Sequence, residues 1–258
     1  MIGFVGEHAE TAASEVTTEL RESDLEISAI QPSDAHRVEV VVALDESSLL
    51  SLAREAIETP ILPVGNNGGL ASAPRAELGA AISSITDGSS EVQDVPTLAV
   101  STPENTYRAL MDVMLVTTEP AKISEYRVST VRDGEPSTVD RVRADGVVVA
   151  GPAGTPGYAT SAGGPILESG VEGVSVVPIG PFRINQSHWV LSPPLSLQVM
   201  REEVPTSLVV DDCTVGGVSK GAAIELEWGP SIRLVRTPVS TSSLMEAERG
   251  SKRPDRRG

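Results

Sequence analysis

Residues 143–166 read RADGVVVAGPAGTPGYATSAGGPI and contain the most distinctive pattern of the chain. The valine run at 147–149 predicts a buried strand, because β-branched side chains favour the extended backbone of a sheet. The run leads into a loop crowded with glycine and proline, which ends in a Gly-Gly-Pro element at 163–165. A ligand can approach such a loop closely, since glycine has no Cβ atom. The stretch therefore predicts a strand followed by a ligand-binding loop.

Further strand patterns lie on both sides of this stretch. Turn residues separate short apolar runs from about residue 95 onwards, and Asp133-Gly134 is a hairpin signal. We expect a β-rich, sandwich-like domain over residues 95–236. Its expected strands are 97–100, 109–117, 122–131, 147–150, 174–178, 196–201, 207–210, 222–228 and 232–236.

Residues 1–94 instead alternate strand and helix patterns, which is typical of an α/β nucleotide-binding domain with a parallel sheet. The polar segment 87–94 is the expected linker, and the polar, charged residues 237–258 are expected to form a disordered tail. The expected strands are 2–5, 25–29, 38–44 and 60–64, and the expected helices lie near 10–21, after Asp45 and near 74–85.

The chain is strongly acidic, with a formal net charge of −16 over 258 residues. This charge argues against nucleic acid as a partner, because no basic patch is available to neutralise phosphates. Lysine is rare, and dense carboxylates with few lysines are typical of proteins that work in concentrated salt, where screening weakens self-repulsion. The alternative is an acidic protein without adaptation to salt.

The remaining composition argues for a protein of the cell interior. Cys213 is the only cysteine, so an internal disulfide is excluded and a reducing compartment is expected. The sequence shows neither a signal-peptide pattern nor an apolar run of membrane-spanning length. The three histidines have no metal-ligand spacing, so no metal-binding residue is predicted. We expect a soluble, cytoplasmic protein that does not bind membranes.

A second candidate ligand loop is Gly65-Asn66-Asn67-Gly68-Gly69, between the strand expected at 60–64 and the helix expected near 74–85. Backbone amides at such a turn, with the start of a helix behind them, can hold phosphate oxygens. Taken alone, the residues favour an ordinary strand-to-helix turn.

The block 143–166 resembles the signature of the NAD kinase family, which reads R-A-D-G, an apolar strand, T-P-T-G-S-T-A-Y and then S-A-G-G-P. The first and last of these elements are kept whole, and Pro152, Gly154 and Tyr158 match within the loop. The resemblance covers about residues 61–236. It implies an NAD kinase-like fold of two domains, an α/β N-terminal domain and a β-rich C-terminal domain, with the dinucleotide bound between them. It also implies Mg²⁺-dependent phosphoryl transfer from ATP, or polyphosphate, to the 2′-hydroxyl of NAD, in a homo-dimer or homo-tetramer.

The resemblance also implies the site residues. Asn67 stands where the family motif G-G-D-G-T has its catalytic Asp, and an amide cannot take up a proton. The loss of a general base typically costs about 10²–10⁴ in rate. The Gly65 and Gly68 backbone is expected at the phosphates. The residues expected at the dinucleotide are Asp112, Asp145, Gly154, Thr155, Tyr158 and Ser161.

Some assignments have alternatives. The family carries an Asn-Glu pair where this chain has Met111-Asp112. Alternatively, Met111 is a residue of the apolar core and Asp112 is a solvated strand residue without a ligand contact. Two other functions stay open. One is a catalytically impaired, nucleotide-binding or regulatory homologue, and the other is a kinase of the related lipid-kinase fold with a different acceptor.

Overall fold

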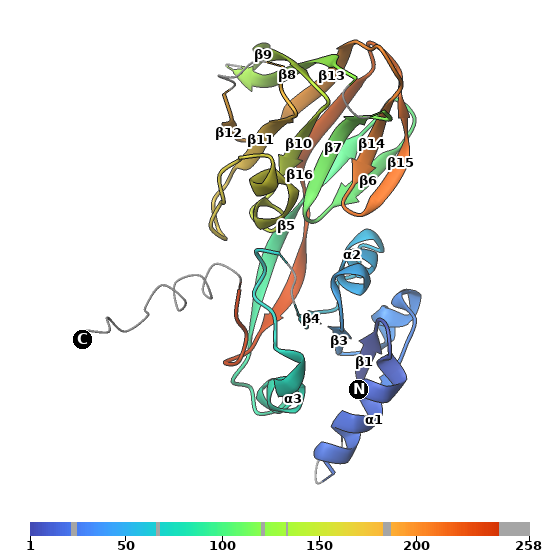
Figure 1. Ribbon diagram of the computed structural model, residues 1–258. Coiled ribbons are helices and arrows are strands. Elements are labelled where there is room, and N and C mark those ends of the chain that lie inside the picture. Colours follow the sequence, from blue (N-terminus) through green and yellow to red (C-terminus); the bar gives the residue numbers. More distant parts are fainter. Residues whose placement is uncertain (22–24, 66–67, 120–121, 133, 183–186, 243–258) are drawn as a thin grey trace, which may run out of the picture. The chain divides into compact units, whose positions relative to one another are not determined.

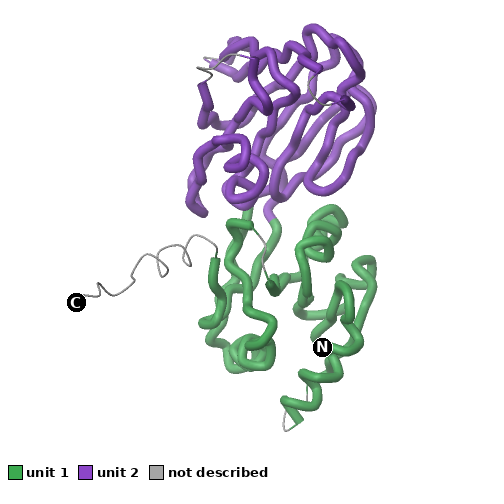
Figure 2. The backbone as a smooth tube through the Cα atoms, in the orientation of Figure 1, with its two compact units in different colours: residues 1–95, 232–258 green, residues 96–231 purple. Residues whose placement is uncertain are grey.

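The computed structural model describes residues 1–21, 25–65, 68–119, 122–132, 134–182 and 187–242. The chain forms two compact units (Figure 2). Unit 1 contains residues 1–95 and 232–258, and unit 2 contains residues 96–231.

Unit 1 is an α/β unit with a parallel sheet (Figure 1). The strand order is β2-β1-β3-β4, and the end of β16 joins β4 through the parallel pair Leu234–Ile61. Every residue of β1 and β3 is buried, which explains why both read as continuous apolar runs. The elements of this unit are β1 (Ile2–Val5), α1 (Ala9–Glu19), β2 (Ile27–Ala29), β3 (Val40–Ala43), α2 (Glu46–Arg54), β4 (Ile61–Pro63) and α3 (Leu78–Thr86), with 3-10 turns at Pro32–Arg37 and Arg75–Glu77.

Unit 2 is built from antiparallel strands in two sheets. One sheet has the order β12-β11-β10-β7-β14-β15, and the other contains β16-β13-β8-β9 with β5 and β6 alongside. Side chains from both sheets, among them Leu115, Tyr126 and Leu197, share one apolar core, as in a sandwich. The strands are β5 (Glu91–Ser101), β6 (Thr106–Ala109), β7 (Asp112–Thr117), β8 (Ser124–Arg132), β9 (Glu135–Ala144), β10 (Gly146–Ala150), β11 (Val174–Ile179), β12 (Trp189–Leu191), β13 (Leu195–Arg201), β14 (Thr206–Val210), β15 (Cys213–Val218) and β16 (Ala223–Arg236).

The boundaries of the expected domains need three corrections. The expected linker 87–94 is partly strand, because β5 begins at Glu91. Residues 232–236, expected in the β-rich domain, belong to unit 1, where β16 pairs with β4. The expected disordered tail begins too early: Thr241 exchanges two backbone hydrogen bonds with Ser72, of 2.8 and 2.9 Å. Residues 243–258 of that tail lie outside the described part of the chain.

Within the described residues, no helix is long and apolar enough to cross a membrane.

Candidate functional site

Strand β10 is buried on both faces, and the glycine-rich loop covers one of them. Val147 and Val149 point into the core of the sandwich. Val148 and Ala150 lie on the other face, in a second apolar cluster that includes Ala159 from the loop. The loop therefore folds back over the outer face of the strand that precedes it. This arrangement explains the unbroken apolar run at 147–150, because a strand with one solvated face would alternate.

The loop begins with a close backbone contact to the segment before β7. The Gly151 N–H donates to the Met111 carbonyl over 3.0 Å, and the Gly154 N–H donates to the Gly151 carbonyl over 3.0 Å. A Cβ atom at Gly154 would overlap the Met111 carbonyl group. Glycine is therefore required at this position, and one π-helical turn, Thr155–Ala159, follows it.

Thr155 stabilises the loop internally. Its side chain is fully buried, and its hydroxyl donates to the Pro152 carbonyl at 3.1 Å and accepts from the Leu167 N–H at 3.0 Å. The hydroxyl thus connects the two ends of the loop. Within the described residues, the Thr155 hydroxyl is engaged by the protein, and a contact between Thr155 and the ligand stays a prediction.

Tyr158 and Ser161 are the exposed members of the predicted site in unit 2. The Tyr158 side chain is 46% exposed, although it is a large aromatic residue. Ser161 is exposed, and its hydroxyl donates to the Gly157 carbonyl at 3.2 Å. Asp112 is buried, at 8% exposure, at the start of β7 and pairs with Ala150. Gly154, Tyr158 and Ser161 thus lie in the loop after β10, and Asp112 lies on β7 beside the same end of β10.

Asp145 lies at the opposite end of β10. Its N–H donates to the Ile179 carbonyl at 2.8 Å, and its own carbonyl accepts from the Thr117 N–H at 2.8 Å. The Tyr126 hydroxyl also donates to this carbonyl, at 3.3 Å, and burial raises the pKa of Tyr126, which keeps the hydroxyl a neutral donor. Gly151 lies six residue steps of extended chain after Asp145, or about 20 Å away. The structure therefore does not gather all the predicted dinucleotide residues in one cluster.

In unit 1, the second candidate loop follows β4. Gly65 and Gly68 have φ angles of +85° and +59°, which favour glycine. The Gly65 N–H donates to the Ala73 carbonyl at 2.9 Å, and the Ser72 hydroxyl donates to the Gly65 carbonyl. These bonds fix the two ends of the loop. Asn67 lies outside the described residues.

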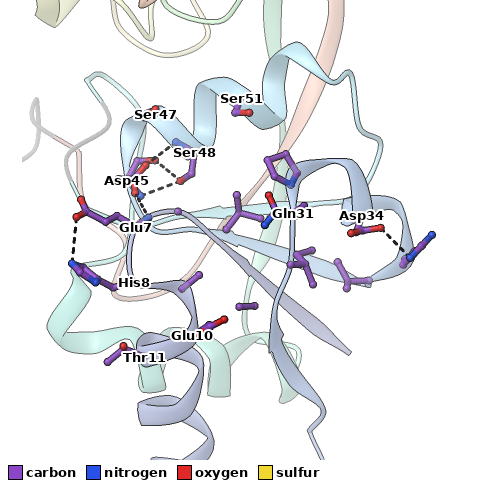
Figure 3. A pocket seen from close by; sticks show the side chains of 18 of the residues that line it. Glu7, His8, Glu10, Thr11, Gln31, Asp34, Asp45, Ser47, Ser48 and Ser51 are labelled. Atoms are coloured by element: carbon purple, nitrogen blue, oxygen red, sulfur yellow. Dashed lines mark hydrogen bonds and ion pairs between the residues drawn. The ribbon is translucent and has the colours of Figure 1, made fainter.

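Unit 1 also contains a cavity of about 1170 Å³ at the carboxyl ends of β1, β2 and β3 (Figure 3). Ligands of parallel sheets commonly bind at this edge. Carboxylates dominate its charged lining, which includes Glu7, Glu10, Asp34 and Asp45. Among the lining residues, His8 pairs with Glu7 at 3.4 Å and Arg37 pairs with Asp34 at 3.0 Å. The amino group of Met1, which also lines the cavity, pairs with Glu39 at 2.9 Å. No ligand is predicted for this cavity from the sequence.

Asp45 shapes the wall of the cavity. Its carboxylate accepts from the Ser48 N–H at 2.7 Å, as the N-cap of α2, and from the Glu7 N–H at 3.1 Å. A Cβ atom at Gly6, where φ is +126°, would lie 2.6 Å from the same carboxylate. One side chain therefore holds both the β1–α1 loop and the start of α2.

We expect Asp45→Ala to lower the free energy of unfolding by about 1–2 kcal/mol at pH 7, because a helix cap and a loop contact are lost. Burial alone would raise the pKa of Asp45, but hydrogen bonds from Ser48 and Glu7 lower it below its ordinary value of 3.8. The contribution is therefore complete above the unfolded pKa and is lost as the pH falls through the folded pKa. Urea unfolding of both proteins at pH 7 and at about pH 3 measures this; an equal difference at both pH values would contradict it.

Among the residues that the structure describes, no group of three or more His, Cys, Asp or Glu side chains could hold a metal ion.

The sequence matches the family model of the ATP-NAD kinase C-terminal domain over residues 110–231, which lie within unit 2. The NAD kinase of Methanoculleus marisnigri is 32% identical over 200 residues, which cover 73% of this chain and 69% of that protein. This chain belongs to the NAD kinase family. The range 110–231 that matches the family model contains β10, the glycine-rich loop and Met111.

Solved structures of NAD and NADH kinases have the same fold. The NAD kinase of Archaeoglobus fulgidus, solved in complex with ATP, has a TM-score of 0.74 at 23% identity and covers 96% of each chain. The yeast NADH kinase, solved in complex with NADH, has a TM-score of 0.76 at 18% identity and covers 92% of this chain and 83% of that chain. The NAD kinase-like fold of an α/β domain and a β-rich domain is thereby confirmed.

Proposed function

We propose that this protein is an NAD kinase, which transfers the γ-phosphoryl group of ATP to the 2′-hydroxyl of NAD and forms NADP and ADP. The observation that carries the proposal is the glycine-rich loop on the outer face of β10, with no space for a side chain at Gly154. Membership of the NAD kinase family supports this reaction. Related structures contain ATP in one case and NADH in another.

In unit 2, polar groups of the glycine-rich loop and of β7 would contact the dinucleotide. Tyr158 offers an aromatic face and a hydroxyl, and Ser161 offers a second hydroxyl, at an accessible position of the loop. Asp112 offers a carboxylate that can accept hydrogen bonds from an amine or a ribose. Gly154 and Thr155 would build the loop, and Asp145 would contact a part of the ligand at the other end of β10.

In unit 1, the Gly65–Gly68 loop would hold phosphates through its backbone amides. The acceptor oxygen attacks the γ-phosphorus atom, the bond to the β-phosphate oxygen breaks, and the hydroxyl proton must leave. Asn67 can orient the hydroxyl by a hydrogen bond but cannot take the proton, so the proton passes to water or to a phosphate oxygen. Catalysis then depends on positioning and on neutralisation of phosphate charge.

Mg²⁺ supplies that neutralisation when it is bound to the phosphates of ATP. Since no described cluster of side chains could hold the ion by itself, we assign it no protein ligand and expect it to arrive with the nucleotide.

A second candidate function is a nucleotide-binding or regulatory homologue with impaired catalysis. Two features support it: the resemblance places Asn67 at the family's catalytic Asp position, and the Thr155 hydroxyl is engaged within the loop. This homologue would still bind NAD.

One experiment separates these functions. The purified protein is incubated with NAD, Mg²⁺ and either ATP or polyphosphate in concentrated KCl, NADP is quantified, and NAD binding is measured by calorimetry. Formation of NADP supports the kinase and identifies the donor. Binding without turnover supports the impaired homologue, and the absence of both would contradict both functions.

We further propose adaptation to salt, a cytoplasmic location and a homo-dimer or homo-tetramer. The net charge of −16 supports the first of these. We expect the melting temperature to rise by at least about 5 °C between dilute buffer and 2 M KCl, roughly 1–2 kcal/mol for a protein of this size, because salt screens the repulsion between carboxylates. Thermal unfolding followed by circular dichroism measures this shift, and an equal melting temperature in both buffers would contradict it. Light scattering in the same buffers gives the oligomeric state.

A further inference from the structure

Asp211 accepts hydrogen bonds from three consecutive backbone amides about 100 residues away in the sequence. Its Oδ1 atom accepts from Met111 at 2.7 Å and from Asp112 at 3.1 Å, and its Oδ2 atom accepts from Leu110 at 3.0 Å. The Asp211 N–H in turn donates to the Asp112 carbonyl at 2.9 Å. Asp211, in the turn between β14 and β15, therefore fixes the whole segment 110–112.

The position suits an aspartate in two respects. Asp211 lies in the turn between β14 and β15 with a φ angle of +52°, a conformation that aspartate and asparagine adopt more readily than most residues. It is only 8% exposed, so three amides there need acceptors from the protein. A carboxylate has enough lone pairs for all three, whereas an amide side chain offers one oxygen and an N–H₂ group that would face an N–H donor.

The segment held in this way is the one on which the glycine-rich loop docks. The Met111 carbonyl accepts from the Gly151 N–H at 3.0 Å and fills the space where a Gly154 side chain would lie. Each residue of the segment is buried. A displacement of Met111 would therefore move the start of the loop that carries Tyr158 and Ser161.

We propose that Asp211 is a positioning residue of the dinucleotide site, which acts through the backbone of Leu110–Asp112 on the placement of the glycine-rich loop. The part of this inference that concerns NAD rests on the proposed function, whereas the part that concerns the docking of the loop does not. Asp211 itself is not expected to touch the ligand, because its carboxylate oxygens are directed at the three amides.

Hydrogen exchange followed by NMR tests the docking in the folded protein. Asp211→Asn keeps the shape of the side chain and tolerates the positive φ angle. We expect the amides of Leu110, Met111, Asp112 and Gly151 to exchange at least about tenfold faster in this variant, because charge-assisted hydrogen bonds are replaced. Asp212→Asn is the matched control, since it makes the same change at the adjacent, exposed position and leaves these three hydrogen bonds intact. Equal exchange in Asp211→Asn and Asp212→Asn would overturn the inference.

The affinity for NAD is measured by calorimetry on the same proteins. We expect the Kd for NAD to rise about tenfold in Asp211→Asn, while the affinity for ATP stays within about twofold and the Asp212→Asn control matches the unsubstituted protein. If the unsubstituted protein binds NAD and Asp211→Asn binds it equally well, the positioning role is overturned and the proposed function stands. If the unsubstituted protein does not bind NAD, the proposed function fails, and the exchange rates still decide the docking.

The unsubstituted protein provides a test that does not depend on the variant folding. Its Leu110, Met111 and Asp112 amides should exchange as slowly as the amides of residues 113–117 in β7. Faster exchange at 110–112 than at 113–117 would show that the carboxylate does not hold the segment, and would overturn the inference.

Discussion

Asn67→Asp is expected to raise the rate of NADP formation by at least about 10²-fold, because under the proposed function it supplies a group at the catalytic position that can take the proton of the attacking hydroxyl. The substitution changes one atom of the side chain and adds one negative charge, so it should leave the loop between β4 and α3 intact. The measurement is the initial rate of NADP formation from NAD, ATP and Mg²⁺ in concentrated KCl, over a range of NAD concentrations. The gain should appear in kcat, with KM changed much less, because the new carboxylate acts in the transition state.

Asn66→Asp is the control for this prediction. It introduces the same charge one residue earlier in the same loop, at a position where the family motif has glycine rather than the catalytic Asp. It should not raise kcat. A gain of equal size in both variants would show a general effect of charge, and no gain in Asn67→Asp with intact NAD binding would assign the loss of activity to another part of the site.

The fold could be predicted to a large extent because its elements have strong local signals. The strands β1, β3 and β10 are buried on both faces, so their unbroken apolar sequences are enough to predict them as strands. Strands β9 and β15, in which few residues are buried, were not predicted from the sequence. Such strands are fixed by their neighbours, β8 and β14, through backbone pairing that leaves no apolar signature.

The site was less predictable, because it depends on contacts between distant residues. The contacts of Asp211 lie 99 to 101 residues away along the chain, so nothing near Asp211 in the sequence distinguishes it from the adjacent Asp212. Thr155 shows the same difficulty from the other side. The sequence predicts that its hydroxyl contacts the ligand, but nothing in the sequence predicts its hydrogen bonds with Pro152 and Leu167. The separation of Asp145 from Gly151 follows from the extended geometry of β10, which a motif written as letters does not express.

Gly154→Ala is expected to have the second large effect, on both stability and binding. A Cβ atom at this position would overlap the backbone of Met111, which cannot rotate away as the end of a flexible side chain could. The loop must then move off the 110–112 segment, and the hydrogen bond from the Gly151 N–H to the Met111 carbonyl would lengthen or break. We expect the free energy of unfolding to fall by about 1–3 kcal/mol, as for other overpacked sites, and the Kd for NAD to rise at least about tenfold.

The control for this substitution is Gly217→Ala in β15, where the nearest atom to an added Cβ is the Thr206 carbonyl oxygen at 3.9 Å, an ordinary contact. Urea unfolding gives the two free energies, and calorimetry gives the two affinities. Because Gly217→Ala introduces the same methyl group without a clash, it should stay close to the unsubstituted protein in both measurements. If Gly154→Ala binds NAD as tightly as Gly217→Ala, then the close approach of the loop to Met111 serves the packing of the sandwich and not the ligand. The loop would then need its glycine for folding alone, and the case for a dinucleotide at this end of β10 would rest on Tyr158 and Ser161.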